Sequence, residues 1–162
     1  MKLEKKLESY FILGLVVIIG SVLRIYNLSE KSLWVDEFGS IRDSENIPWW
    51  SGHPPLYFII LHFFRYMGTN EFVLRLPSVI FGVSTILLSY MIGKLLFGTK
   101  EGLVSAFLLS ISTMHIYYSQ EARMYSLLAF LSLSSLFFFY KSIREKNKVG
   151  TWIGFILLTL LS

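Results

Sequence analysis

Long apolar runs alternate with short polar stretches along the whole chain. A transmembrane helix needs about 20 apolar residues, with a usual range of about 17 to 25. The pattern therefore predicts four full transmembrane helices, in residues 10–23, 72–97, 102–118 and 124–140, and a partial fifth in residues 150–161. The first run is short for a span, but two further apolar residues extend it beyond Arg24, which can snorkel to the interface.

A cleaved signal peptide is the competing interpretation of the first run. We disfavour it, because no clear small-x-small cleavage site follows the apolar residues.

Residues 27–71 form a long first loop that is too polar to lie wholly in lipid. Within it, residues 36–45 predict a short amphipathic helix, and the Pro-Trp-Trp sequence at 48–50 is typical of an aromatic patch at the membrane interface. Residues 54–67 are apolar but too few to cross, and they include a histidine and an arginine, so we expect an interfacial or re-entrant helix.

Composition places the chain among integral membrane proteins. It has 162 residues, of which 54% are hydrophobic and 16% are charged, whereas a soluble domain carries about 25% charged residues. We therefore expect an all-α, polytopic membrane protein in which residues 1–162 form a single transmembrane domain. The absence of cysteine excludes disulfides and Cys-based metal or redox sites. Nothing resembles a face that binds nucleic acid.

The distribution of basic residues predicts the orientation. If residues 54–67 do not cross, then the N-terminus, the turn at 94–100 and the loop at 141–148 share one side. The positive-inside rule makes this side cytoplasmic in the cell membrane. It holds nine of the 15 Lys and Arg residues: Lys2, Lys5, Lys6, Lys94, Lys100, Lys141, Arg144, Lys146 and Lys148.

In this orientation the candidate functional residues all lie on the external side: Asp36, His53, Arg75 and residues 120–123. Most of the arginines lie on it or at its boundary: Arg24, Arg42, Arg65, Arg75 and Arg123. Because Arg binds phosphate bidentately, this cluster beside lipid suggests recognition of a lipid-linked phosphate. A plainer interpretation, which we favour for the first three, is that they snorkel or pair with nearby carboxylates: Asp43, Glu45 and Glu71.

Asp36 and Glu37 are adjacent carboxylates just beyond the first apolar run. On a helix, adjacent side chains diverge by about 100°, so the two do not form a symmetric acid/base pair. We expect one to act on substrate while the other orients it, binds a metal or caps a helix. From residue type alone, Asp36 is expected to cap the helix that begins there.

His53 and Arg75 are the next candidates. His53 precedes two prolines at a helix start and is compatible with a plain surface histidine. Arg75 lies in the first turns of a span, where an ionisable group marks a functional site by default.

The densest polar cluster is Tyr-Tyr-Ser-Gln-Glu-Ala-Arg-Met-Tyr at residues 117–125. If it is helical, Gln120 and Arg123 share a face and Glu121 meets Tyr125. The alternative is an ordinary turn between helices with an aromatic belt. We expect His115, near the same end, to be a packed histidine and not a ligand.

Four sequence motifs, in this order, resemble those of the GT-C membrane glycosyltransferases, in particular the protein-mannosyltransferase-like group that uses polyprenyl-phosphate-linked sugars. The matching segments are Trp-Val-Asp-Glu at 34–37, His-Pro-Pro-Leu-Tyr at 53–57, Phe-Val-Leu-Arg-Leu-Pro-Ser at 72–78, and the cluster at 117–125.

The resemblance implies a transfer of sugar from a polyprenyl-phosphate donor to a hydroxyl of a protein, lipid or glycan acceptor, with inversion at the anomeric carbon. Asp36 is then the candidate general base, and Glu37 its neighbour in the catalytic site. Arg75 and Arg123 would hold the donor phosphate or organise the external loop. The other candidates would bind substrate or, for the first three, a divalent metal: His53, Gln120, Glu121 and Tyr125.

Members of the group are usually several times longer, so the chain is expected to be the N-terminal part of such an enzyme, with a second chain as the possible source of the missing spans. A non-catalytic membrane protein that binds polyprenyl phosphate or a partner is the alternative function. A small transporter or channel subunit is the least favoured, because no charge lies deep within a predicted span.

The predicted orientation can be tested at the turn between the second and third runs. A cysteine that replaces Thr99 should resist an impermeant thiol reagent in intact cells and react after the membrane is opened. Modification in intact cells would contradict this topology.

Overall fold

The computed structural model describes residues 2–46, 54–144 and 149–161. Within these ranges the chain forms helices and no strand, as the sequence predicts. The helices are α1 (Lys2–Ile25), α2 (Val35–Glu45), α3 (Leu56–Arg65), α4 (Glu71–Leu96), α5 (Thr99–Ser110), α6 (Thr113–Ser119), α7 (Tyr125–Arg144) and α8 (Val149–Leu161).

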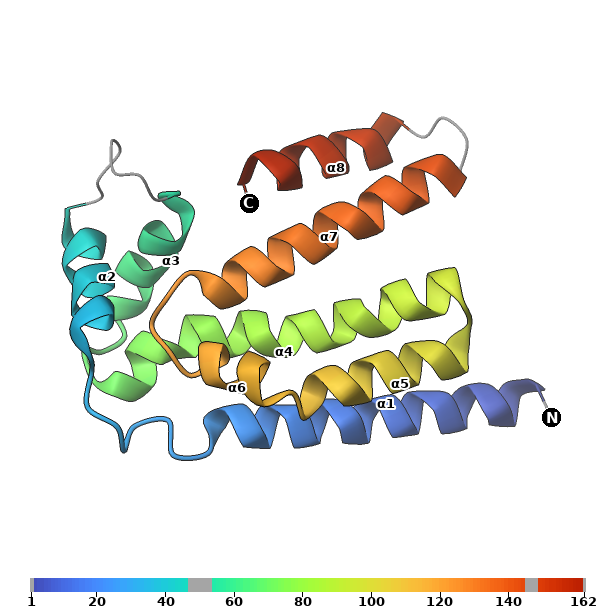
Figure 1. Ribbon diagram of the computed structural model, residues 1–162, viewed down its shortest axis with the longest axis horizontal. Helices are drawn as coiled ribbons and strands as arrows, with labels where there is room; N and C mark the ends of the chain where they lie inside the picture. The colour runs from blue at the N-terminus through green and yellow to red at the C-terminus, as the bar shows by residue number, and fades with distance from the viewer. Residues whose placement is uncertain (1, 47–53, 145–148, 162) are drawn as a thin grey trace.

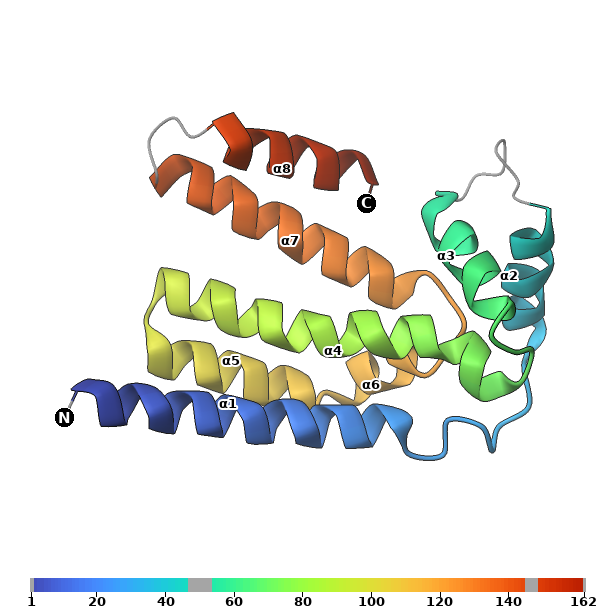
Figure 2. The same cartoon turned by 180° about the vertical axis from the view of Figure 1, so that it is seen from behind.

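The long helices lie side by side, and the short helices α2 and α3 stand across one end of the bundle (Figure 1). At the opposite end of the bundle lie the N-terminus and the α4–α5 turn. The C-terminal end of α7 and the N-terminal end of α8 lie there as well, in both views (Figures 1 and 2). The two groups of loops expected on opposite sides of the membrane are therefore at opposite ends of the molecule.

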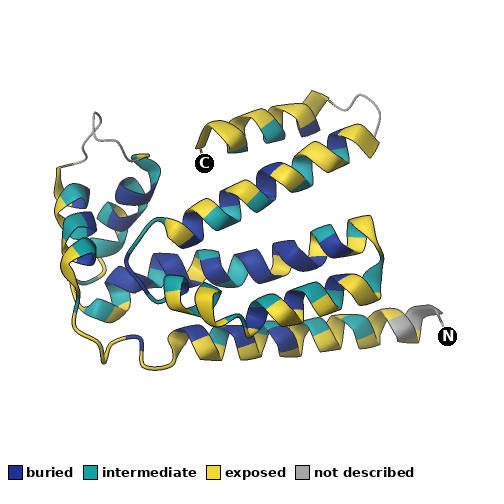
Figure 3. Cartoon of the chain, in the orientation of Figure 1, coloured by how far each residue is buried: buried dark blue, intermediate teal, exposed yellow. Residues whose placement is uncertain are grey.

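Three helical segments in the described part are long and apolar enough to cross a membrane: Lys6–Ile25, Glu71–Leu96 and Tyr125–Arg144. Many of their outward-facing apolar side chains are exposed, for example Phe11 at 70%, and such surface is suited to lipid. Buried residues gather on α4, which lies inside the bundle (Figure 3). The helical membrane-protein class predicted from the sequence is confirmed.

The third predicted span is divided into α5 and α6. A helix leaves its last carbonyl groups without partners, and here the Arg24 guanidinium supplies donors to two of them, Ser110 at 3.1 Å and Leu109 at 3.2 Å. Ser112 then starts α6 by accepting a hydrogen bond from the His115 backbone N–H. Ser110, Ser112 and Thr113 stand at the break, but the length and overall hydrophobicity of the run indicated a single span.

Arg24 itself does not snorkel, contrary to our expectation. Its side chain has no exposed surface, because its guanidinium also donates to the Gly20 carbonyl at 2.8 Å and contacts His115 Nδ1 at 2.9 Å. A cation at the negative end of a helix is favourable. His115 is a packed histidine, as predicted.

The first loop contains the two helices that the sequence predicts, α2 and α3. Arg65 pairs with Glu45 at 2.6 Å and Arg42 with Asp43 at 3.6 Å, so the expected pairing of these two arginines is confirmed. The predicted aromatic patch at 48–50 lies outside the described residues. A core of Tyr57, from α3, with side chains of α4 and α7 joins this loop to the bundle.

Two glycines set the distance between α4 and α5. A Cβ on Gly93 would lie 2.8 Å from the Cα of Gly102, which is closer than real Cβ contacts allow. Gly14, in α1, has open space around its Cβ position.

Gly93→Ala should therefore destabilise the bundle by about 1 to 3 kcal/mol, because backbone must move to admit the methyl group. Gly14→Ala is the matched control and should leave stability unchanged or raise it by up to about 1 kcal/mol, through helix propensity. Thermal unfolding in detergent micelles measures both, and equal midpoints for the two variants would contradict the close approach.

Candidate functional site

A buried ion pair between Glu37 and Arg75 lies where α2 meets α4. Arg75 Nε donates to Glu37 Oε1 and Arg75 Nη2 donates to Glu37 Oε2, both at 2.8 Å. The side chains are 0% and 4% exposed. This bidentate geometry is the strong form of an Arg–carboxylate interaction.

The remaining donors of Arg75 hold the loop that follows α1. Nη1 donates to the carbonyl oxygens of Leu28 at 2.7 Å and Lys31 at 2.9 Å, and Nη2 donates to that of Ser32 at 3.3 Å. One side chain of α4 therefore fixes both the loop and the first turn of α2.

Glu37 also accepts hydrogen bonds from two backbone groups. The N–H of Ala122 donates to Oε1 at 2.7 Å, and the N–H of Trp34 donates to Oε2 at 3.3 Å. Burial raises the pKa of the Glu37 carboxyl, but these bonds and those from Arg75 outweigh burial and hold the pKa below its ordinary value of 4.5. Glu37 is thus an ionised group whose two oxygens are both engaged.

Asp36 has the opposite environment. Its side chain is 45% exposed, and Oδ2 lies 3.9 Å from Arg123 Nη2. The expectation that Asp36 caps α2 is wrong, because α2 begins at Val35 and Trp34 is the N-cap residue. The carboxylate of Asp36 is therefore available to a ligand while its neighbour is buried.

Arg123 brings the segment between α6 and α7 to the same place. Nη1 donates to the Asp36 carbonyl at 3.1 Å and to Ser40 Oγ at 3.3 Å, and the guanidinium lies 5.5 Å from the centre of the Tyr125 ring. Its own carbonyl accepts a hydrogen bond from Ser78 Oγ at 3.1 Å. Arg123 is only 15% exposed on its side chain.

The other two candidates of this segment have different surroundings. Gln120 Nε2 donates to carbonyls at the end of α1, the shortest bond being 2.9 Å to Tyr26. Glu121 is buried and its Oε2 has no hydrogen-bond partner in the described part of the chain. Burial, opposed by a hydrogen bond with Tyr117 and reinforced by the charge of Glu37, raises the pKa of Glu121.

The helical geometry assumed for this segment is therefore wrong. Residues 120–124 lie between α6 and α7, so Gln120 and Arg123 do not share a helix face, and Tyr125 contacts Arg123. Because the helix is broken here, Gln120 can contact the end of α1, Arg123 can contact α2, and Glu121 can point into the interior.

His53, predicted as a substrate-binding residue, lies outside the described residues. Among the residues the structure describes, no group of three or more His, Asp or Glu side chains is arranged to hold a metal ion. The structure thus brings together Asp36, Glu37, Arg75 and Arg123, with Tyr125 beside them.

Sequence reasoning missed the small residues that support this cluster. Ser40 follows Asp36 by one helical turn and accepts from Arg123, a spacing that could have been noticed. Ser78 contacts the Tyr57 hydroxyl at 3.0 Å, and the Ala122 N–H gave no signal at all, because backbone donors are not visible in a sequence.

Comparisons with known proteins identify a family for most of the chain. Residues 52–161 match the family described as dolichyl-phosphate-mannose-protein mannosyltransferase. An uncharacterised protein of Aquifex aeolicus (strain VF5) is 26% identical over 162 aligned residues, which cover 90% of this chain and 32% of the relative. The chain therefore spans about a third of the length of that curated relative. No solved structure matches the chain.

The Glu37–Arg75 pair predicts a pH-dependent stability. Since the folded-state pKa of Glu37 is below 4.5, its contribution is complete above the unfolded pKa and is lost as pH falls through the folded value. Glu37→Gln should lose about 3 to 5 kcal/mol at pH 7, because Arg75 is left as a buried unpaired charge, and should lose less on acidification.

Thermal unfolding between pH 3 and 7 measures this, with Glu30→Gln in the exposed loop as the control. An identical pH profile for Glu37→Gln and wild type would show that the pair does not set acid stability.

Proposed function

The chain belongs to the dolichyl-phosphate-mannose-protein mannosyltransferase family, as its motifs predicted, and from this premise we propose that it forms the N-terminal part of a GT-C glycosyltransferase. The proposed reaction moves a sugar from a polyprenyl-phosphate donor to a hydroxyl of a protein, lipid or glycan acceptor, with inversion. The observation that carries this proposal is the contrast between the exposed carboxylate of Asp36 and the buried, ionised carboxylate of Glu37.

Asp36 is the proposed general base. A hydroxyl is a weak nucleophile until a positioned base takes its proton. The half-exposed carboxylate of Asp36 can accept that proton as the acceptor oxygen attacks the anomeric carbon. The bond from that carbon to the phosphate oxygen breaks in the same displacement, and the lipid phosphate leaves with the electron pair.

Glu37 and Arg75 are proposed to position this base. Because both oxygens of Glu37 are engaged by Arg75, Ala122 and Trp34, the carboxylate is not available to substrate. It instead fixes the first turn of α2, and hence the backbone of Asp36. In our proposal Glu37 therefore acts through Asp36 and not on the sugar.

Arg123 and Tyr125 are proposed to contact the polyprenyl-phosphate donor. A phosphate leaving group requires positive charge or hydrogen-bond donors as it departs. The Arg123 guanidinium lies 3.9 Å from the Asp36 carboxylate, so one cation is close to the proposed base. Its Nε atom is buried with no hydrogen-bond partner in the described part of the chain.

The other predicted residues keep supporting roles in this proposal. Gln120 joins the segment to the end of α1, Glu121 is buried within it, and His53 is proposed to bind substrate. The site is proposed to lie on the external face of the cell membrane, with the N-terminus cytoplasmic, because the opposite end of the bundle carries the basic residues.

Asp36→Asn should abolish sugar transfer without changing membrane insertion, because the amide cannot take the proton. A general base typically contributes about 10² to 10⁴ in rate. The assay uses membranes that contain the chain and a radiolabelled polyprenyl-phosphate sugar, with and without a second chain that supplies the remaining spans.

Asp43→Asn, on the same helix and outside the site, is the matched control and should retain transfer. Undiminished transfer by Asp36→Asn would rule out this residue as the base, and equal loss in both variants would point to damage to α2.

A further inference from the structure

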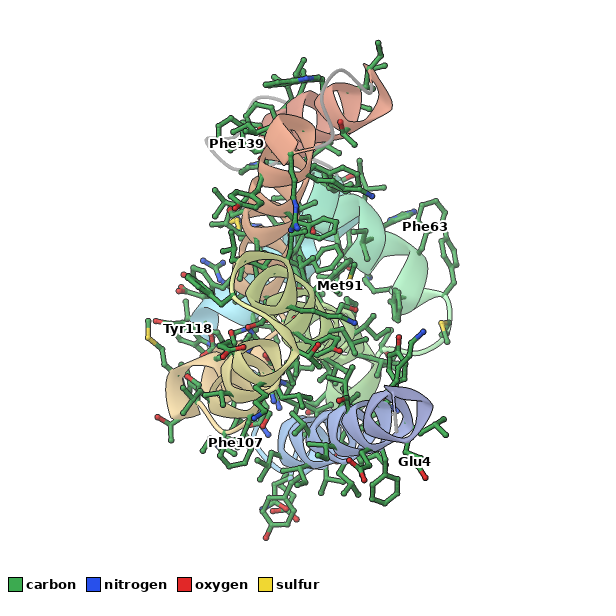
Figure 4. All side chains as sticks on the ribbon, turned by 90° about the vertical axis from the view of Figure 1, so that its right-hand side faces the viewer. Glu4, Phe63, Met91, Phe107, Tyr118 and Phe139 are labelled. Atoms are coloured by element: carbon green, nitrogen blue, oxygen red, sulfur yellow. The ribbon has the colours of Figure 1, made fainter. Side chains whose placement is uncertain are left out.

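The end of the bundle opposite Asp36 contains a basic hollow that the proposed transfer does not use. Its volume is about 330 Å³, and it lies among α1, the end of α4 and the start of α5. Its lining includes three lysines and two tyrosines: Lys6, Lys94, Lys100, Tyr10 and Tyr90. Figure 4 views the molecule from this end.

A second hollow adjoins the first on the other side of Lys94. It measures about 460 Å³ and is shared by α1, α4 and α7. Tyr10, Tyr90 and Lys94 line both hollows, and the second adds Arg144 together with the apolar side chains Met91, Leu95 and Phe137. A ligand that occupied both would meet cations in one part and apolar side chains in the other.

Tyr90 carries an unsatisfied hydroxyl at the boundary between the hollows. The residue is 5% exposed, and its hydroxyl oxygen is buried without a hydrogen-bond partner in the described part of the chain. Buried polar groups are normally paired. The Lys94 ammonium lies over the Tyr90 ring at 5.3 Å from its centre and over the Tyr10 ring at 5.6 Å, so a donor and a cation are close together.

The described lining of the two hollows carries only positive charge, although Glu4 and Glu101 lie in the first turns of α1 and α5. Within the described residues, neither hollow is lined by an Asp or Glu side chain. Thr99 and Lys100, which line the first hollow, form the first turn of α5, where the helix dipole adds positive potential. The N-cap of α5 is Gly98, and the Glu101 carboxylate in the same first turn lies beside it and offsets part of this potential.

We propose that these two hollows bind an anionic phospholipid of the surrounding membrane, with its phosphate among Lys6, Lys94 and Lys100 and an acyl chain along Met91, Leu95 and Phe137. The combination of a cationic and an apolar part fits an amphiphile with a negative headgroup. Basic pockets between membrane helices are a recurrent form of lipid headgroup site. The Tyr90 hydroxyl donates to the phosphate in this arrangement.

The test measures lipid retention by the complete chain. The protein is purified in a neutral detergent, mixed with phosphatidylglycerol or phosphatidylcholine of identical acyl chains, and examined by native mass spectrometry. Phosphatidylglycerol should be retained about fivefold or more over phosphatidylcholine, and Lys94→Gln should remove most of that preference. Equal retention of the two lipids by wild type would overturn the proposal.

Lys141→Gln is the matched control. Lys141 lies near the end of α7 with its ammonium 5.9 Å from the centre of the Phe137 ring, but it lines neither hollow. It should retain the preference, and an equal loss in Lys94→Gln and Lys141→Gln would show attraction by net charge alone and contradict a defined site.

Tyr90→Phe keeps the test decisive if Lys94→Gln does not fold. It removes only the hydroxyl, so phosphatidylglycerol retention should fall by at least about twofold while the unfolding temperature in neutral detergent is unchanged. Unchanged retention would exclude Tyr90 as a donor and overturn the proposed placement of the phosphate. A further arm adds inorganic phosphate at the lipid's concentration, and complete displacement of the lipid would identify a site for a soluble anion instead.

Discussion

The ion pair between Glu37 and Arg75 is the interaction on which the end of this protein that carries α2 and α3 depends. A buried charge is costly unless it is both paired and hydrogen-bonded, and here every oxygen of the carboxylate and all three guanidinium nitrogens have partners. Because those partners come from the loop after α1, from α2, from α4 and from the segment before α7, one pair determines how four parts of the chain meet. The exposed carboxylate of Asp36 takes its position from this arrangement.

Inside the bundle, a second buried arginine, Arg24, donates its hydrogen bonds to backbone carbonyls and not to a carboxylate. Arg24 is completely buried, yet its guanidinium contacts helix-end carbonyls and a histidine nitrogen. This lets a buried charged residue stabilise a break in a helix inside the bundle. Glycines at the α4–α5 contact serve the complementary purpose, since they let backbones approach closely, as is common between membrane helices.

Much of this architecture was predictable from hydrophobic run lengths and the distribution of Lys and Arg. Those signals gave the helical class, the two short helices of the first loop and the separation of the loops into two ends, because helix length and charge placement are local properties. The break between α5 and α6 was not predicted, since the run is long enough for a single span and Arg24, which binds the carbonyls at the break, is distant in sequence. Likewise, the adjacent residues Asp36 and Glu37 gave no indication that Glu37 is buried and Asp36 exposed. The difference depends on contacts of Glu37 with Arg75 and Ala122, which are distant in sequence.

The long sequence separations within the Glu37 cluster also impose an order on biosynthesis. The chain is made from its N-terminus, so Glu37 and Arg75 are both present well before residue 122 has been synthesised. An arginine entering the bilayer alone is costly, whereas one that already holds a carboxylate enters as a neutral pair. The Ala122 N–H can join only afterwards. Formation of the pair would thus accompany insertion of α4, and addition of the segment before α7 would complete the site as a later and separate step.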